Sequence, residues 1–263
     1  MPISLTPFKH QPLCFGNAWV VPDIDLLALN IARVAMGQSR HVQKILAGAS
    51  LSALPSTKNA AKGAIELLTV ESGADPWHRD GWMFQVMSWI AANRATPGGI
   101  IRAPHMILAH KGFDGLQLIL DKVTGNVTAA ILFEDKATEN PRSTIRDQVW
   151  PEFSAFETGD RENVLAAEVT ALLVTQPGVD ADSAIQNIIW NKARQYRVSI
   201  TVEAQHSDGP GRVRLFKGYR TVVAGATRRR QGEIFYVKDL RNWMQSLADA
   251  AIAAVNKEVK ANV

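Results

Sequence analysis

Two apolar segments joined by a turn, residues 113–120 and 127–136, constrain the fold of this chain more than any other feature. Each segment has the length of a strand, and Thr124-Gly125-Asn126 between them is typical of a tight turn, so the pattern predicts a β-hairpin. A turn centred on Thr124 places Asp114 opposite Glu134. Directly opposed residues share one face of a sheet, so these two carboxylates are expected to lie close together.

Lys136 should point to the same face as Glu134, because side chains alternate along a strand with a period of two. Two carboxylates and an ammonium group would then meet at the open end of an otherwise apolar hairpin. Unpaired like charges on neighbouring strands are destabilising, and a divalent cation between them would account for the arrangement. Mg²⁺ commonly takes one or two protein carboxylates, together with waters and substrate phosphate. The alternative is a hairpin with a merely hydrated, charged end.

Asp114 followed, after an apolar strand, by Glu134-Asp135-Lys136 resembles the motif of the PD-(D/E)xK nuclease superfamily, which has the restriction-endonuclease-like fold. The resemblance covers roughly residues 78–205 and implies an α/β protein with an αβββαβ core, a mixed sheet flanked by helices. It implies that Asp114, Glu134 and Lys136 are catalytic. It also implies Asp114, Glu134 and Asp135 (the last for instance through its backbone carbonyl) as ligands of Mg²⁺, for which Mn²⁺ can substitute.

Residues that support such a site are expected on both sides of the hairpin. A buried helix over residues 81–93, with Asp80 as N-cap, is apolar almost all round. Its start resembles the first core helix of the superfamily with Gln85 in place of the usual Glu, so Gln85 is either a site residue or a core amide bonded to the sheet backbone. Gln148 is a second supporting candidate.

His110 is a third supporting candidate, because it lies four residues before Asp114. It follows a short strand expected over residues 106–109, and no Cys or His partner stands at zinc-ligand spacing. The segment from His110 to Asp114 is also similar to part of the nuclease subunits of Hachiman-type anti-phage systems. That resemblance implies a partner helicase or ATPase, since the chain has no P-loop of its own. Self-association into a homo-oligomer is the alternative.

Contacts to nucleic acid are expected from two groups of arginines. Arg142 and Arg146 follow the lysine strand, where the second core helix of the superfamily often touches the DNA backbone. Three consecutive arginines, Arg228, Arg229 and Arg230, lie in an expected loop and could grip phosphates, although a hydrated loop is the simpler interpretation. The net charge of +4 is compatible with a polyanionic partner without requiring one.

We expect residues 1–263 to form a single domain. Residues 1–76 are interpreted as a helical N-terminal elaboration with helices over 23–36 and 58–69, and residues 78–205 as the nuclease-like core. Within the core, helices are expected over 161–174 and 182–193, with a strand over 197–203. Residues 206–263 should add strands at 213–219 and 234–237 and a C-terminal amphipathic helix over 239–260.

The composition, with 46% hydrophobic and 21% charged residues, is typical of a globular protein. No apolar run approaches the roughly 20 residues of a membrane span, and the first residues do not resemble a signal peptide. Cys14 is the single cysteine, which excludes an internal disulfide and fits a reducing cytosol. A cytoplasmic protein without membrane contact is therefore expected.

These observations lead to one main hypothesis and one alternative. The main hypothesis is an Mg²⁺-dependent endonuclease that cleaves DNA within a bacterial anti-phage defence or restriction system. The alternative is a non-catalytic subunit with a nuclease-like fold that binds nucleic acid or a partner protein. The replacement at Gln85 favours the alternative, whereas the intact set of Asp114, Glu134 and Lys136 favours the enzyme.

Overall fold

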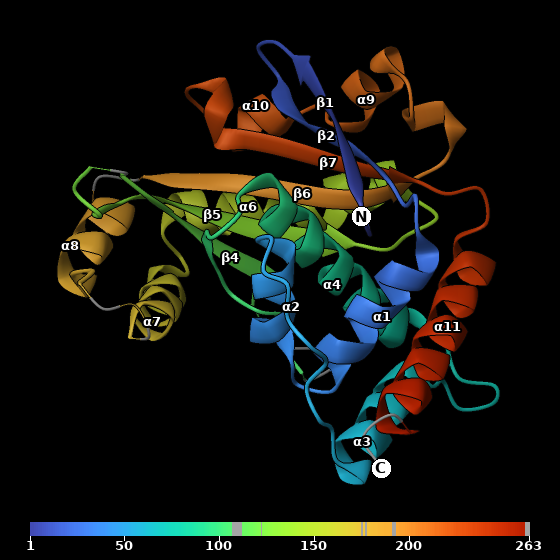
Figure 1. Ribbon diagram of the computed structural model, residues 1–263. Coiled ribbons are helices and arrows are strands. Elements are labelled where there is room, and N and C mark those ends of the chain that lie inside the picture. Colours follow the sequence, from blue (N-terminus) through green and yellow to red (C-terminus); the bar gives the residue numbers. More distant parts are fainter. Residues whose placement is uncertain (107–111, 122, 175, 177, 191–192, 261–263) are drawn as a thin grey trace.

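The protein is an α/β structure built on one seven-stranded mixed sheet, as the computed structural model shows (Figure 1). The structure describes residues 1–106, 112–121, 123–174, 176, 178–190 and 193–260. The strand order is β1-β2-β7-β6-β5-β4-β3. The strands are β1 (Ser4–His10), β2 (Cys14–Val20), β3 (Ile100–Ile101), β4 (Gly115–Leu120), β5 (Val127–Lys136), β6 (Arg194–Val202) and β7 (Arg230–Tyr236).

Strand direction divides the sheet into an antiparallel half and a parallel half. Strands β3, β4 and β5 form an antiparallel meander, whereas β5, β6, β7 and β2 run parallel, and β1 pairs antiparallel with β2 at the far edge. The central strands β5 and β6 are buried on both faces, in keeping with their nearly continuous apolar sequences.

Helices cover both faces of the sheet. Ile131 and Phe133 of β5 face one apolar cluster, to which α1 (Ile24–Ala35), α2 (Ser39–Leu46), α3 (Lys58–Leu68), α4 (Trp77–Ala95) and α11 (Leu240–Lys260) contribute. In Figure 1 these five helices lie together below the sheet. Ala130 and Leu132 of β5 face the second cluster.

The remaining described helices pack on this second face. They are α5 (Pro141–Thr144), α6 (Trp150–Thr158), α7 (Glu162–Leu173), α8 (Ala181–Ile185), α9 (Gly209–Leu215) and α10 (Tyr219–Val222), with π-helical turns at Ile145–Val149 and Gln186–Trp190 and 3₁₀ turns at Ala204–His206 and Thr227–Arg229. The expected helix over 161–174 is confirmed as α7, whereas the one expected over 182–193 is α8 followed by a π-helical turn. None of the helices in the described ranges is both long and apolar enough to cross a membrane.

The predicted hairpin is confirmed, including its register. Gly115 pairs with Phe133 and Leu118 with Ala130, which is the alignment expected from a turn centred on Thr124. The register shifts only between Ile119 and Leu120, next to the turn. The N–H of Asp114 donates to the carbonyl of Phe133 at 3.0 Å, so the two strands stay together as far as the carboxylates.

The buried helix before the hairpin is confirmed as α4, but it begins at Trp77, four residues earlier than expected. Asp80 is therefore not its N-cap. It lies in the first turn, where its side chain is fully buried and accepts hydrogen bonds from Arg79 and Arg241. The sequence alone did not show this cluster, because Arg241 is contributed by the distant helix α11.

The expectation of a purely helical N-terminal segment is wrong. Residues 24–35 and 58–68 are helical as expected, but β1 and β2 precede them and extend the sheet beyond β7. Pro7 lies in β1, and the edge of a sheet is where a strand tolerates proline, because the missing N–H faces outward. Gly16 of β2 lies so close to the backbone of Gly232 in β7 that any side chain at Gly16 would collide with it.

The C-terminal expectations are partly confirmed. Strand β7 and helix α11 occupy the expected places, as does β6 over most of residues 197–203. Residues 213–219 do not form a strand, because α9 covers residues 209–215 and a turn follows it. The strand expected over residues 106–109 falls mostly outside the described residues, as does His110.

Candidate functional site

Three charged side chains meet where β5 ends. The Nζ atom of Lys136 lies 2.7 Å from Oε2 of Glu134 and 3.2 Å from Oδ2 of Asp114. The hairpin produces this arrangement, because the confirmed register brings Asp114 beside the end of β5 while the two-residue period places Glu134 and Lys136 on one face. The structure thus brings together the three residues that the sequence singled out.

Helix α4 and the backbone of β5 hold Asp114 in position. Its Oδ1 atom accepts a hydrogen bond of 2.7 Å from Nε2 of Gln85, and its Oδ2 atom accepts one of 2.8 Å from the N–H of Asp135. Gln85 is therefore a residue of the site, and its amide donates to a carboxylate rather than to the sheet backbone. Each oxygen of Asp114 has a defined partner, so its orientation is fixed before any ligand arrives.

Glu134 is buried, with 3% of its surface exposed. Burial and the nearby Asp114 carboxylate together raise the pKa of Glu134 to about 8, against the opposing effect of Lys136. Burial lowers the pKa of Lys136, but the carboxylates of Asp114 and Glu134 outweigh burial and raise it above its usual value. Lys136 is thus a fixed positive charge between two acids, and the acids retain a mutual repulsion that an added cation would relieve.

Asp135 points to the opposite face of the sheet, toward α4. Its Oδ1 atom accepts a hydrogen bond of 2.6 Å from Ser88, and Ser88 in turn contacts Ser199 and accepts from Nη1 of Arg197 at 2.8 Å. Burial raises the pKa of Asp135 to about 7, although Arg197 opposes that rise. The side chain of Asp135 is thus bound to Ser88 and its N–H orients Asp114, while the expectation that its backbone carbonyl binds a metal stays a prediction.

The charged side chains of Asp114 and Lys136 border a cleft of about 820 Å³ between α4 and the segment that follows β5. Asp114, Gln85 and Lys136 are among the lining residues. A second hollow of about 380 Å³ adjoins it on the side of Glu134, and Lys136, Asp147 and Gln148 line both. Gln148, expected as a supporting residue, is exposed and stands on the shared wall.

The arginines expected to bind nucleic acid do not form one surface. Arg146 is exposed and paired with Asp147 at 2.6 Å, beside the cleft. Arg142 is half-buried and donates to the carbonyl of Leu215 at 3.1 Å, so it fastens α5 to α9. Arg228 is exposed in the turn before β7.

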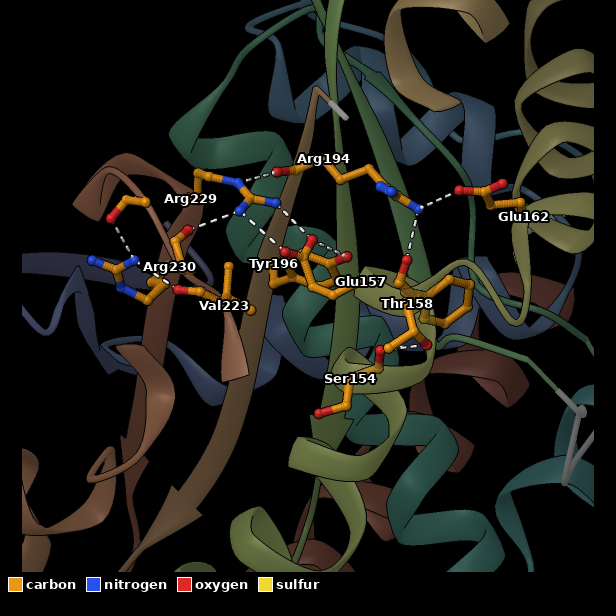
Figure 2. A network of polar contacts seen from close by, with 12 residues as sticks. Ser154, Glu157, Thr158, Glu162, Arg194, Tyr196, Val223, Arg229 and Arg230 are labelled. Carbon is orange, nitrogen blue, oxygen red and sulfur yellow. Dashed lines mark hydrogen bonds and ion pairs between the residues drawn. The ribbon is translucent and has the colours of Figure 1, made fainter. Parts of the chain in front are cut away.

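The expectation that Arg229 and Arg230 grip phosphates is contradicted by their contacts. Arg230 is 1% exposed and donates to the carbonyls of Pro12, Leu13, Val223 and Gly225. Figure 2 shows Arg229 turned inward, where it pairs with Glu157 at 2.6 Å. Both guanidinium groups are occupied by acceptors of the protein itself, since they donate to backbone carbonyls before β2 and near the starts of β6 and β7.

Several residues of the site were missed from the sequence alone. Ser88 lies in the buried middle of α4 and Arg197 in the buried strand β6, and a polar residue among mostly apolar neighbours was the only signal of either. Comparison with protein-family models, curated proteins and solved structures found no match to the chain. In the described part of the chain, no cluster of three or more His, Cys, Asp or Glu side chains could hold a metal.

The raised pKa values predict how the stability of the metal-free protein depends on pH. A carboxyl whose pKa is higher in the folded than in the unfolded state binds its proton more tightly when folded. Between the usual value of 4.5 and about 8 for Glu134, the free energy of unfolding should therefore fall as pH rises. The expected loss is on the order of 5 kcal/mol, measured by urea unfolding in the presence of a chelator.

The Glu134→Gln variant is the control for this prediction, because an amide of the same shape cannot titrate. It should show a flatter dependence over the same range, with Asp135 accounting for the part that stays. Lys136 adds no slope there, because its raised pKa affects stability only at higher pH. Equal slopes for the variant and the wild-type protein would contradict this assignment.

Proposed function

We propose that the protein is a metal-dependent nuclease that cleaves phosphodiester bonds, with Asp114, Glu134 and Lys136 as its catalytic residues. One observation carries this proposal: Lys136 Nζ contacts both carboxylates, with Asp114 and Lys136 lining an open cleft of about 820 Å³ and Glu134 lining the hollow that adjoins it. Ion pairs that serve only stability do not need a cleft of this size beside them. A cleft with residues of strongly perturbed pKa is the usual place of an active site.

The order of the elements supports the proposal. Helix α4, the meander β3-β4-β5, the helices from α5 to α8 and the parallel strand β6 follow one another along the chain. This is the order αβββαβ that the resemblance to the PD-(D/E)xK superfamily implied, with Asp114 directly before β4 and with Glu134 and Lys136 at the end of β5. We infer that the central part of the chain is a restriction-endonuclease-like core.

The donor set fits Mg²⁺. Asp114 and Glu134 would hold the ion, since Mg²⁺ needs only one or two protein carboxylates and retains several waters. Burial, and after it the repulsion from Asp114, raises the pKa of Glu134, and a second cation beside Lys136 would relieve that repulsion. Bound there, the ion would supply an acidified water and neutralise charge on the phosphate.

The side chains of the protein would divide the remaining work. Lys136 would donate a hydrogen bond to the attacking water or to a phosphate oxygen, which stabilises negative charge in the transition state. Gln85 and the N–H of Asp135 would keep Asp114 oriented. Ser88 and Arg197 would hold Asp135 in place from below the sheet.

One observation favours the alternative of a non-catalytic binding subunit. Lys136 already compensates much of the charge of both acids, so the site is stable without a metal. Cleavage assays separate the two possibilities. The nuclease should degrade plasmid DNA, single-stranded DNA or RNA with Mg²⁺ or Mn²⁺ and stop when EDTA is added. Binding of nucleic acid without metal-dependent cleavage of any of these substrates would establish the alternative.

We further propose that a partner controls the enzyme, as the Hachiman-type resemblance implies. A nuclease that acted alone on cellular DNA would be toxic, so a helicase or ATPase partner, or self-association, should position it within a defence system. We expect the mass in solution to exceed that of one chain, or a neighbouring gene product to co-purify with it. A lone monomer that rapidly cuts duplex DNA would contradict this proposal.

A further inference from the structure

A stripe of three residues on α4 leads from the rim of the cleft to the candidate catalytic acids. Trp77, Gly81 and Gln85 follow one another at intervals of four, so they lie on one face of the helix, and all three line the cleft. The stripe spans about 12 Å along the helix axis. Gln85, at its inner end, contacts Asp114. A ligand along this stripe would therefore reach the acids.

Trp77 marks the outer end of the stripe. It is 64% exposed, which is unusual for the largest apolar side chain, and it stands in the first turn of α4. Trp82, which also lines the cleft, is 3% exposed, and its Nε1 donates to the carbonyl of His105. Trp82 thus belongs to the structure of the wall, whereas the ring of Trp77 presents an accessible surface on which a flat ligand can stack.

Gly81 keeps the path between Trp77 and Gln85 open. A glycine in the interior of a helix is destabilising relative to alanine, so its presence calls for a reason. A Cβ atom at Gly81 would meet no other atom within 4 Å, so packing does not exclude a side chain there. A side chain at position 81 would therefore extend into the cleft and occupy part of it.

The charges of the cleft argue against a duplex as its ligand. Its described lining residues include four carboxylates but only two cations, Lys136 and Arg241, and both cations are already paired with acids. Proteins that bind duplex DNA through its backbone rely on several free lysines and arginines. Sites for single strands also use cationic groups along the backbone, but stacking of unpaired bases on aromatic rings adds roughly 1–3 kcal/mol per base, which a duplex does not gain because its bases are already stacked on one another.

We propose that the groove over Gly81 binds an unpaired polynucleotide strand, with a base stacked on Trp77 and a neighbouring phosphate directed to Asp114 and Lys136. This inference rests on the proposed nuclease function and specifies its substrate as single-stranded. Thr138, Asn140 and Gln148 on the opposite wall offer uncharged hydrogen-bonding groups to the bases or sugars of that strand.

Binding and cleavage, measured separately, test this inference. Binding is measured by fluorescence anisotropy with the full-length Glu134→Gln variant, which should not cut, using labelled single-stranded DNA, single-stranded RNA and a matched DNA duplex. At least one of the two single strands should bind about tenfold or more tightly than the duplex. Trp77→Ala should weaken that binding about tenfold, while Trp77→Phe, which keeps an aromatic face, should retain most of it.

Glycine substitutions probe the groove itself. Gly81→Leu should fill the path and weaken single-strand binding at least as much as Trp77→Ala. Gly63→Leu is the matched control, because Gly63 also lies within a helix with no atom within 4 Å of an added Cβ, but on α3 and outside the cleft. This control should bind like the parent protein, and circular dichroism should show that both leucine variants are folded.

The outcomes distinguish this inference from the proposed function. Equal binding of duplex and single strands, or unchanged single-strand binding by Trp77→Ala, would overturn the inference even if the wild-type protein is an active nuclease. The predicted binding pattern without any metal-dependent cleavage by the wild-type protein would support the groove as a single-strand site. The absence of metal-dependent cleavage in that case would count against the proposed nuclease function and not against the single-strand site.

Discussion

Replacing Glu134 by glutamine is expected to lower metal-dependent cleavage by about a thousandfold or more while the protein stays folded. Removing a residue that acts directly in catalysis commonly has an effect of this size. Glutamine keeps the shape of the side chain, and its oxygen can still accept a hydrogen bond from Lys136, but it cannot replace a charged metal ligand. The measurement is the initial rate of cleavage at saturating Mg²⁺.

The design of this experiment depends on how deeply Glu134 is buried. Alanine at Glu134 or Lys136 would be harmless to folding only if both residues lay outside the core, as a strand end suggests. Glu134 is 3% exposed, however, and breaking a buried ion pair by removing one partner costs about 3–5 kcal/mol. Alanine variants would therefore confuse loss of catalysis with loss of folding, and the isosteric glutamine avoids this.

The matched control is Glu258→Gln. Glu258 is a largely buried carboxylate paired with Arg33 at 3.1 Å, on α11 and outside the residues that line the cleft. This variant should cleave at the wild-type rate once both proteins are shown to be folded. A Glu134→Gln protein that cuts as fast as Glu258→Gln would place the catalytic site elsewhere.

The hairpin and its charged end were predictable because they depend on neighbours in sequence. The turn at Thr124-Gly125-Asn126 sets the register, and the register with the two-residue period places Asp114, Glu134 and Lys136 together. The helix α4 was equally accessible from its apolar sequence. Local chemistry of this kind needs no knowledge of the rest of the chain.

Features that depend on distant partners could not be predicted in this way. Strand β2 is held by β7, more than two hundred residues later, and nothing within residues 14–20 indicates that pairing. Arg230 looked like part of an exposed basic loop, yet the carbonyls of Pro12 and Val223 surround it. A charged side chain reveals its role only once its partners are known, and here tertiary structure supplies them.

Substituting Asp80 with alanine is expected to lower the free energy of unfolding by about 3–5 kcal/mol. The side chain of Asp80 is fully buried and binds Arg79 at 2.8 Å and Arg241 at 2.6 Å. Alanine would leave Arg79, itself 4% exposed, without its carboxylate, so that a buried cation would be poorly compensated. Urea unfolding should show the loss, and the melting temperature should fall by about 10 °C.

The comparison variant is Asp249→Ala on α11. Asp249 is exposed and accepts a hydrogen bond from Gln245, so its removal should change stability by no more than about 0.5 kcal/mol. Asp80→Asn should fall between the two, because an amide oxygen still accepts from Arg79 but carries no charge. If Asp80→Ala were as stable as Asp249→Ala, the buried cluster would contribute nothing to folding.

Asp80 also joins the first turn of α4 to α11, so the same cluster fixes where the wall that carries Trp77 begins. Well below the melting temperature of Asp80→Ala this wall should stay in place, and the cleavage rate of the variant should then fall less than tenfold.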